Sequence, residues 1–307
     1  MSRIQDILNK AERDGGVRRT RAIGTDAPPL PPVSSRAGAS GAAAPRPLVE
    51  PTPIAEHREA RARHLEAPGA PPAAPPSSSR DARFDHRLVA ALAPQSLAAE
   101  QYRSLRTRIS SAENGRAMRA LIVTSPAKGD GKSLTAANLS LTMAQEFSQR
   151  VLLIDADLRR PSIHHLFDLA ETPGLTDVLM GAVSLDDALV TLPDHHLTVL
   201  PSGVPPSHPA ELLGSVAMRR TIDALRTRFD RLVLDMPPVS PLADVHIASA
   251  LADGILMIVR AGITPKPAIE RALSGLDASK VLGLVLNEAG PESGADTYYN
   301  GYGYIAG

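Results

Sequence analysis

The sequence predicts an α/β fold built on a doubly wound, mostly parallel sheet. Between Ala120 and Asn287, short apolar runs alternate with segments of helical periodicity. The runs are continuously apolar, as expected for strands that helices cover on both faces. They are Ala120–Val123, Val151–Ile154, Leu197–Leu200, Leu232–Leu234, Ile255–Val259 and Val281–Leu286. Because ligands of such sheets bind beyond the carboxyl ends of the strands, we expect the functional residues there.

A strand, a glycine-bearing loop and a helix follow one another in Ala120–Asn138, which reads ALIVTSPAKGDGKSLTAAN. This is the context of a phosphate-binding loop, whose backbone N–H groups and helix N-terminus attract an anion. We expect Lys132 to reach the β- and γ-phosphates of a nucleotide and Ser133 to bind Mg²⁺. The expected nucleotide-binding residues of the loop are Gly129, Asp130, Gly131, Lys132, Ser133 and Leu134. The pattern is imperfect, since Pro126 replaces the first glycine of the usual motif.

Carboxylates follow two of the predicted strands. Asp155 and Asp157 come after Val151–Ile154, and Asp235 comes after Leu232–Leu234. We expect them to emerge at one edge of the sheet beside the phosphate loop, where a Walker B-like aspartate holds Mg²⁺ directly or through water. The alternative for any single aspartate is to cap the helix that follows. Three such carboxylates in a chain with a phosphate loop favour a metal and phosphate site.

Composition divides the chain into four parts. We expect a short amphipathic helix within residues 1–16, a disordered linker at 17–82, the folded domain at 83–289 and a flexible tail at 290–307. The linker is rich in proline, alanine, serine and arginine and lacks aromatic residues. It therefore cannot bury enough apolar surface to offset the entropy lost on ordering.

Charge and cysteine content exclude several classes of protein. The formal net charge is zero, which does not suggest a nucleic-acid binder. The chain has no cysteine, and hence no disulfide or thiolate site. Its N-terminus lacks the apolar core of a signal peptide, and no apolar run is long enough to span a bilayer. We therefore expect a cytoplasmic protein, whose membrane role, if it has one, comes through a partner.

The segment Leu97–Ile109 is predicted to be a helix with two faces. Its apolar side is expected to consist of Ala98, Tyr102, Leu105 and Ile109. The opposite side is expected to carry Glu100, Arg103 and Arg106. These charges can simply be solvated, or they can form salt bridges between subunits. Spacing alone does not choose between these two possibilities.

The C-terminal segment concentrates the tyrosines of the chain. Four of the five lie within the last ten residues: Tyr298, Tyr299, Tyr302 and Tyr304. Glycines and polar residues surround them, which favours an accessible, flexible segment. The alternative, in which these aromatic side chains dock into a core, is disfavoured because no apolar pattern continues here.

Several segments resemble, in order, the motifs of the bacterial tyrosine autokinases of exopolysaccharide and capsule synthesis, which are relatives of the deviant-Walker ATPases of cell division and plasmid partition. The segments are EQYRSLR, similar to their E-x-x-R-x-x-R motif, TSPAKGDGKS, similar to Walker A, LLIDADLRRP, similar to the A′ box, and LVLDMPP, similar to Walker B. The opening MSRIQDILNKAE and the linker resemble the subgroup encoded with exosortase systems. One departure concerns the signature lysine of the partition ATPases, because Ala127 stands at its position and Lys128 follows one residue later.

The resemblance implies a P-loop NTPase fold and an ATP- and Mg²⁺-dependent kinase that phosphorylates its own tyrosine cluster, between subunits of a ring. It assigns the catalytic roles to Lys132, Asp155 and Asp157, with Asp155 accepting the proton of the tyrosine hydroxyl. The implied Mg²⁺ ligands are Ser133, Asp157 and Asp235. Asn287 is expected to contact adenine. The implied phosphoacceptors are Tyr298, Tyr299, Tyr302 and Tyr304, and the implied ring interface is Glu100, Arg103 and Arg106.

The resemblance also implies partners. These are a transmembrane polysaccharide co-polymerase as activator, other copies of the chain, and a tyrosine phosphatase. Two alternatives remain: a positioning ATPase of the division and partition type without kinase activity, and a catalytically silent nucleotide-binding scaffold. The shifted lysine and the tyrosine-rich tail count against the first. The intact loop lysine and strand-end aspartates count against the second.

Overall fold

The structure is a computed structural model that describes residues 83–113, 118–146 and 149–289. The predicted N-terminal helix, the predicted linker and the tyrosine cluster lie outside these residues. Within the described ranges, no helix is both long and apolar enough to cross a bilayer.

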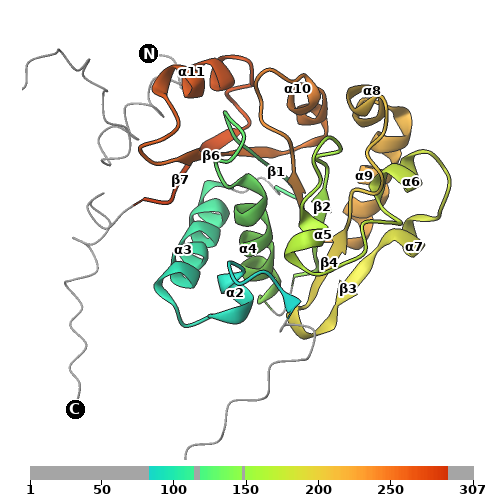
Figure 1. Cartoon of the computed structure of the whole chain (residues 1–307), viewed down its shortest axis with the longest axis horizontal. Coiled ribbons are helices and arrows are strands. Elements are labelled where there is room, and N and C mark those ends of the chain that lie inside the picture. The colour runs from blue at the N-terminus through green and yellow to red at the C-terminus, as the bar shows by residue number, and fades with distance from the viewer. Residues whose placement is uncertain (1–82, 114–117, 147–148, 290–307) are drawn as a thin grey trace, which may run out of the picture. The chain divides into compact units, whose positions relative to one another are not determined.

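A seven-stranded sheet forms the centre of the folded unit (Figure 1). The strand order is β3-β4-β2-β5-β1-β6-β7, in which β3 runs antiparallel to β4 and every other neighbouring pair is parallel. The strands are β1 (Ala120–Thr124), β2 (Val151–Asp155), β3 (Val190–Leu192), β4 (Leu197–Leu200), β5 (Arg231–Asp235), β6 (Gly254–Arg260) and β7 (Val281–Asn287). The chain passes from β1 to β2 on one side, whereas β6 and β7 lie on the other. The order therefore reverses at β1, which is where sheets of this kind bind ligands.

This sheet confirms the predicted fold class. Each of the six apolar runs lies within one strand, and the parallel pairing follows from the helices between them. The sequence missed only β3 among the described strands. Its three residues are too few for a recognisable pattern, and only Leu192 among them is buried.

Helices cover both faces of the sheet (Figure 1). They are α2 (Val89–Leu92), α3 (Leu97–Ala112), α4 (Lys132–Ala144), α5 (Ile163–Leu166), α6 (Leu175–Leu179), α7 (Leu185–Ala188), α8 (Pro209–Leu213), α9 (Val216–Arg228), α10 (Asp244–Ala248) and α11 (Lys266–Ser274), with 3₁₀ turns η2 (Pro193–His195) and η3 (Ser249–Leu251). The hydroxyl of Ser96 caps α3 by accepting the N–H of Ala99 at 3.2 Å. Both α3 and α4 begin where the sequence predicted, at Leu97 and Lys132.

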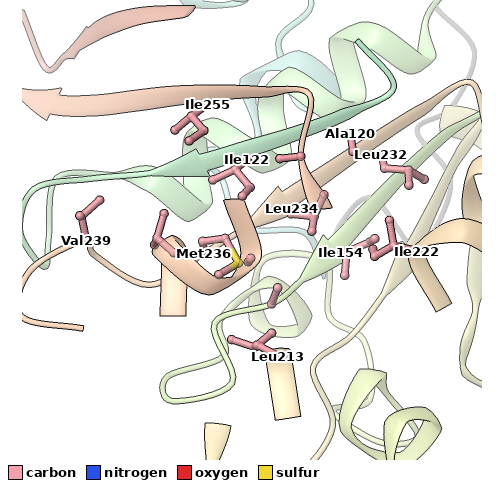
Figure 2. Close-up of a cluster of buried hydrophobic side chains, with 14 of the residues drawn as sticks. Ala120, Ile122, Ile154, Leu213, Ile222, Leu232, Leu234, Met236, Val239 and Ile255 are labelled. Carbon is pink, nitrogen blue, oxygen red and sulfur yellow. The ribbon is translucent and has the colours of Figure 1, made fainter. Parts of the chain in front are cut away.

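The alternation of side chains along the strands builds two cores. On β1, Ala120 and Ile122 face one core, and Leu121 and Val123 face the other. Figure 2 shows part of the first core, where β1, β2, β5 and β6 meet residues of α8 and α9. The second core packs the opposite face of the sheet against α2, α4 and α5. Because both faces are buried, the polar ends of the strands are the part of the sheet left for chemistry.

Candidate active site

The phosphate loop between β1 and α4 has the backbone shape that its glycines permit. Gly129 has φ 88° and Gly131 has φ 92°, in the left-handed region that other residues rarely adopt. Gly131 also has no room for a side chain, because a Cβ there would lie 2.0 Å from Nδ2 of Asn287. The helix α4 begins directly afterwards at Lys132, so its first backbone N–H groups are available to an anion.

The loop lysine lies among the strand-end carboxylates. Lys132 Nζ is 2.8 Å from Oδ2 of Asp157 and 3.3 Å from Oδ1 of Asp235. It also lies 3.0 Å from the hydroxyl of Ser133. The structure therefore brings together residues from the phosphate loop, from the segment after β2 and from the end of β5, as the sequence predicted.

Burial and crowding of charge set the protonation of this cluster. Asp155 and Asp235 are fully buried and lie opposite each other on paired strands. Burial, assisted by the charge of Asp235, raises the pKa of Asp155 to about 7. Burial also raises the pKa of Asp235, although the Lys132 ammonium opposes that rise. Burial lowers the pKa of Lys132, but the carboxylates of Asp235 and Asp157 outweigh it and hold the lysine charged.

The Asp155 carboxylate also accepts hydrogen bonds from the backbone. Its Oδ2 accepts the backbone N–H groups of Ser162 and Ile163, both at 2.9 Å, at the start of α5. Its Oδ1 accepts the N–H of Asp157 at 3.3 Å. The helix-capping alternative therefore applies to Asp155 in part. A pKa near neutrality suits a group that accepts a proton, so the two roles are compatible.

The cluster suits a divalent cation and a nucleotide phosphate. The Ser133 hydroxyl hydrogen-bonds Asp235, and the Asp157 carboxylate contacts the same Lys132 Nζ. Hydroxyl and carboxylate oxygens are the ligands that Mg²⁺ prefers. In the structure the Lys132 ammonium lies among the side-chain oxygens of Ser133, Asp157 and Asp235, so these oxygens can surround a positive charge. Ser133, Asp157 and Asp235 thus fit the group that the sequence assigned to them.

Asn287 lies at the phosphate loop, at the carboxyl end of β7. Its Nδ2 donates to the carbonyl oxygen of Asp130 at 3.0 Å, and its amide packs against Gly131. The side chain of Asp130 is bonded within the protein, so only its backbone N–H can face a phosphate. The side chain of Leu134 packs against the second core, so only its backbone N–H can face a phosphate. The adenine contact predicted for Asn287 remains a prediction.

Arg159 makes an ion pair that the sequence did not reveal. Its guanidinium donates to both oxygens of Asp244, at 2.8 and 3.0 Å, and Asp244 is fully buried at the start of α10. The pair connects the segment after β2 with the segment after β5. The two residues are 85 positions apart, and no local pattern signals such a pairing. Arg159 thus has a partner within its own chain.

The faces predicted for α3 need a correction. Ala98 is exposed, and Ala99 is buried instead. Arg106 does not lie opposite the apolar side: it donates to the carbonyl of Thr142 on α4 at 2.8 Å and pairs with Glu146 at 3.1 Å. The buried side of α3 is therefore rotated toward Arg106. The packing against α4 tolerates this residue because the long arginine side chain can lie along α4 and still reach polar partners. Glu100 and Arg103 pair with each other at 2.7 Å.

Known proteins resemble this chain in sequence. The family model described as "AAA domain" matches residues 118–276. The tyrosine-protein kinase YwqD of Bacillus subtilis (strain 168) is 39% identical over 227 residues, which cover 73% of this chain and 94% of YwqD. The chain belongs to the bacterial tyrosine-protein kinases. The positioning ATPase considered as an alternative is therefore the weaker interpretation.

Another relative and a solved structure match over a similar share of the chain. The putative tyrosine-protein kinase CapB of Staphylococcus aureus is 31% identical, with 67% of this chain and 91% of CapB covered. The crystal structure of the chimerical protein CapA2B2 matches with a TM-score of 0.64 and 30% identity, over 67% of this chain and 92% of that one. The match covers more than nine tenths of YwqD and of CapB, so the similarity extends over nearly the whole length of both tyrosine-protein kinases.

Proposed function

We propose that this protein is an ATP-dependent tyrosine autokinase that phosphorylates its own C-terminal tyrosine cluster. The observation that carries the proposal is that Lys132, at the end of the phosphate loop, bonds to Asp157, Asp235 and Ser133. Phosphoryl transfer needs positioning and charge neutralisation more than covalent help from the protein. A lysine with two carboxylates and a hydroxyl supplies these requirements.

The site residues divide the work between them. The N–H groups of Gly129–Leu134 bind the phosphates, and Lys132 turns from its carboxylates toward them. Ser133, Asp157 and Asp235 hold Mg²⁺, which neutralises phosphate charge when bound. Asp155 accepts the proton of the tyrosine hydroxyl, a role that its pKa of about 7 supports. The side-chain oxygen Oδ1 of Asn287 contacts the adenine base, since the side-chain nitrogen Nδ2 is bonded to Asp130.

The acceptors are Tyr298, Tyr299, Tyr302 and Tyr304 of a second subunit. Tyr102, the remaining tyrosine of the chain, lies against Thr135 and Asn138 of α4. Burial raises the pKa of Tyr102 despite hydrogen bonds to those two side chains. A tyrosine fixed in this way is a poor substrate, which supports the assignment to the tail.

The cellular role follows from the family resemblance. A transmembrane polysaccharide co-polymerase activates the kinase, and a tyrosine phosphatase resets it. The cycle then regulates polymerisation or export of an exopolysaccharide, in a system of the exosortase-associated kind. The kinase acts in the cytoplasm and joins the inner membrane through the co-polymerase.

Intact-mass analysis after incubation with ATP and Mg²⁺ tests this function. We expect a series of added phosphoryl groups on the full chain, and more of them when the cytoplasmic segment of the activator is present. Peptide mapping should place the groups on the C-terminal tyrosines. Hydrolysis of ATP without any gain in protein mass would instead favour the positioning ATPase.

The proposed ring interface gives a separate prediction. Replacing Glu100 and Arg103 by alanine should remove the multimer that light scattering detects for the unphosphorylated protein with its activator. Both side chains are partly exposed, and besides pairing with Glu100, Arg103 only donates to the carbonyl of the nearby Pro94 at 2.8 Å, so the monomer should stay folded. The additional change Arg106→Ala should also lower the melting temperature, because Arg106 bonds to α4.

The matched control for this surface is Arg108→Ala. Arg108 is exposed on the same helix and lies outside the predicted motif. A multimer that survives the loss of Glu100 and Arg103 would mean that this face is merely solvated. Equal loss of assembly in Arg108→Ala would point to the overall charge of the helix rather than to the motif.

A further inference from the structure

The phosphate loop is tied to the segment between β6 and α11. Asp130, inside the loop, is only 3% exposed. Its Oδ2 accepts the backbone N–H of Ala127 at 2.9 Å, and its Oδ1 accepts the hydroxyl of Thr264 at 2.7 Å. The first bond closes the loop on itself. The second bond joins it to a residue 134 positions away.

Thr264 is itself held in place, which fixes the direction of its hydroxyl. Its Oγ1 accepts the N–H of Arg260 at 3.0 Å, and its own N–H donates to the carbonyl of Arg260 at 3.0 Å. Gly262, with φ 71°, allows the tight turn between them. A hydroxyl has a single hydrogen to donate, so that of Thr264 goes to Asp130.

Asp130 is tied on its backbone side as well. Its carbonyl oxygen accepts Nδ2 of Asn287 at 3.0 Å. The carbonyl of Asn287 in turn accepts the N–H of Ala261 at 2.9 Å. The turn after β6 and the end of β7 therefore hold Asp130 through two separate bonds. Loss of one of them should loosen the loop without unfolding it.

A carboxylate inside a phosphate-binding loop can oppose the binding of phosphate. If it were free to turn, its negative charge would repel the phosphates that the loop must receive. Because Ala127 and Thr264 occupy both oxygens, the charge of Asp130 is directed to donors within the protein. We propose that Thr264 is a positioning residue that holds the Asp130 carboxylate and thereby keeps the phosphate loop in its nucleotide-binding shape. This inference rests on the proposed nucleotide site.

The test compares two substitutions at Thr264. Thr264→Val keeps the shape of the side chain but removes the hydroxyl, whereas Thr264→Ser keeps the hydroxyl. Isothermal titration with Mg²⁺ and ADP should give roughly tenfold weaker binding for Thr264→Val, given the usual strength of a hydrogen bond to a charged group. Thr264→Ser should bind within about twofold of the wild type, since the bond to Asp130 is retained.

A control substitution separates this effect from the general loss of a threonine hydroxyl. Thr227 on α9 donates its hydroxyl to the carbonyl of Ala224 at 2.7 Å and is exposed. Thr227→Val should leave ADP binding unchanged. In an Asp130→Ala background, Thr264→Val should weaken ADP binding little further, because the carboxylate it positions is absent.

Three results would overturn the inference. The first is unchanged ADP binding by Thr264→Val, even if its melting temperature falls. The second is an equal loss of ADP affinity in the serine and valine variants, and the third is a full tenfold loss of affinity by Thr264→Val in the Asp130→Ala background. A wild-type protein that bound no nucleotide would remove the proposed site together with this role. Normal wild-type binding alongside an unaffected Thr264→Val variant would remove only the role of Thr264.

Discussion

Lys132→Met should abolish phosphotyrosine formation and also destabilise the nucleotide-free protein. The lysine side chain is 12% exposed and bonds to two carboxylates that are almost completely buried. Without it, Asp157 and Asp235 lose the ammonium group that pairs with both of them. Breaking a buried ion pair in this way typically costs about 3 kcal/mol, lessened here when the carboxylates take up protons.

Asp155→Asn should also abolish phosphorylation. Unlike Lys132→Met, it should stabilise the nucleotide-free protein. Its folded pKa of about 7 lies above the ordinary 3.8, so the folded state binds the proton more tightly. The wild type therefore loses stability as the pH rises from 3.8 through about 7. Asparagine does not titrate, and its oxygen can still accept from Ser162 and Ile163. We expect a gain on the order of 1 kcal/mol near pH 8 and a smaller one near pH 5.

Phosphotyrosine blots and chemical denaturation of the nucleotide-free variants check both expectations. Asp157→Asn should also abolish phosphorylation, because its carboxylate is a proposed Mg²⁺ ligand. Lys280→Met is the matched control, since Lys280 bonds to the carbonyl of Ser249 at 2.7 Å, away from the cluster. Undiminished phosphorylation in Lys132→Met or Asp157→Asn would refute the assignment of the site. A loss of stability in Asp155→Asn would show that its bonds to α5 outweigh its burial.

The parts of this site that sequence could predict are those that the sheet itself brings together. Asp155 and Asp235 each end a buried apolar run, and parallel strands place such residues at one edge. The phosphate loop has a local signature, because its glycines and lysine are close in sequence. Lys132 therefore meets Asp157 and Asp235 as predicted.

The parts that could not be predicted depend on contacts between distant segments. Arg159 bonds to Asp244 over 85 positions of sequence, and Thr264 bonds to Asp130 over 134 positions. Periodicity gave the existence of α3 but not its rotation. The buried arc of α3 is narrow, with only Ala99 and Ile109 of its residues buried, so the pattern did not show that this arc is shifted by one residue toward Ala99 and Arg106.

Replacing Tyr298, Tyr299, Tyr302 and Tyr304 by phenylalanine should remove nearly all autophosphorylation while leaving ATP binding close to normal. These four residues lie outside the described part of the structure, so the prediction rests on the sequence and on the site. Phenylalanine keeps the aromatic ring but cannot accept phosphate. The matched control is Tyr102→Phe, which should retain most of the label because Tyr102 packs against α4.

The same variant should stay in its assembled form. Each phosphate adds about −1.5 to −2 charge at neutral pH. Several on one short segment would repel one another and would be repelled by an active site that already contains Asp155, Asp157 and Asp235. Phosphorylation should therefore release the segment from the neighbouring subunit and favour dissociation, which phenylalanine prevents. Light scattering before and after incubation with ATP measures this, and phosphotyrosine mapped mainly to Tyr102 would contradict it, because the tail would then be neither the substrate nor the switch.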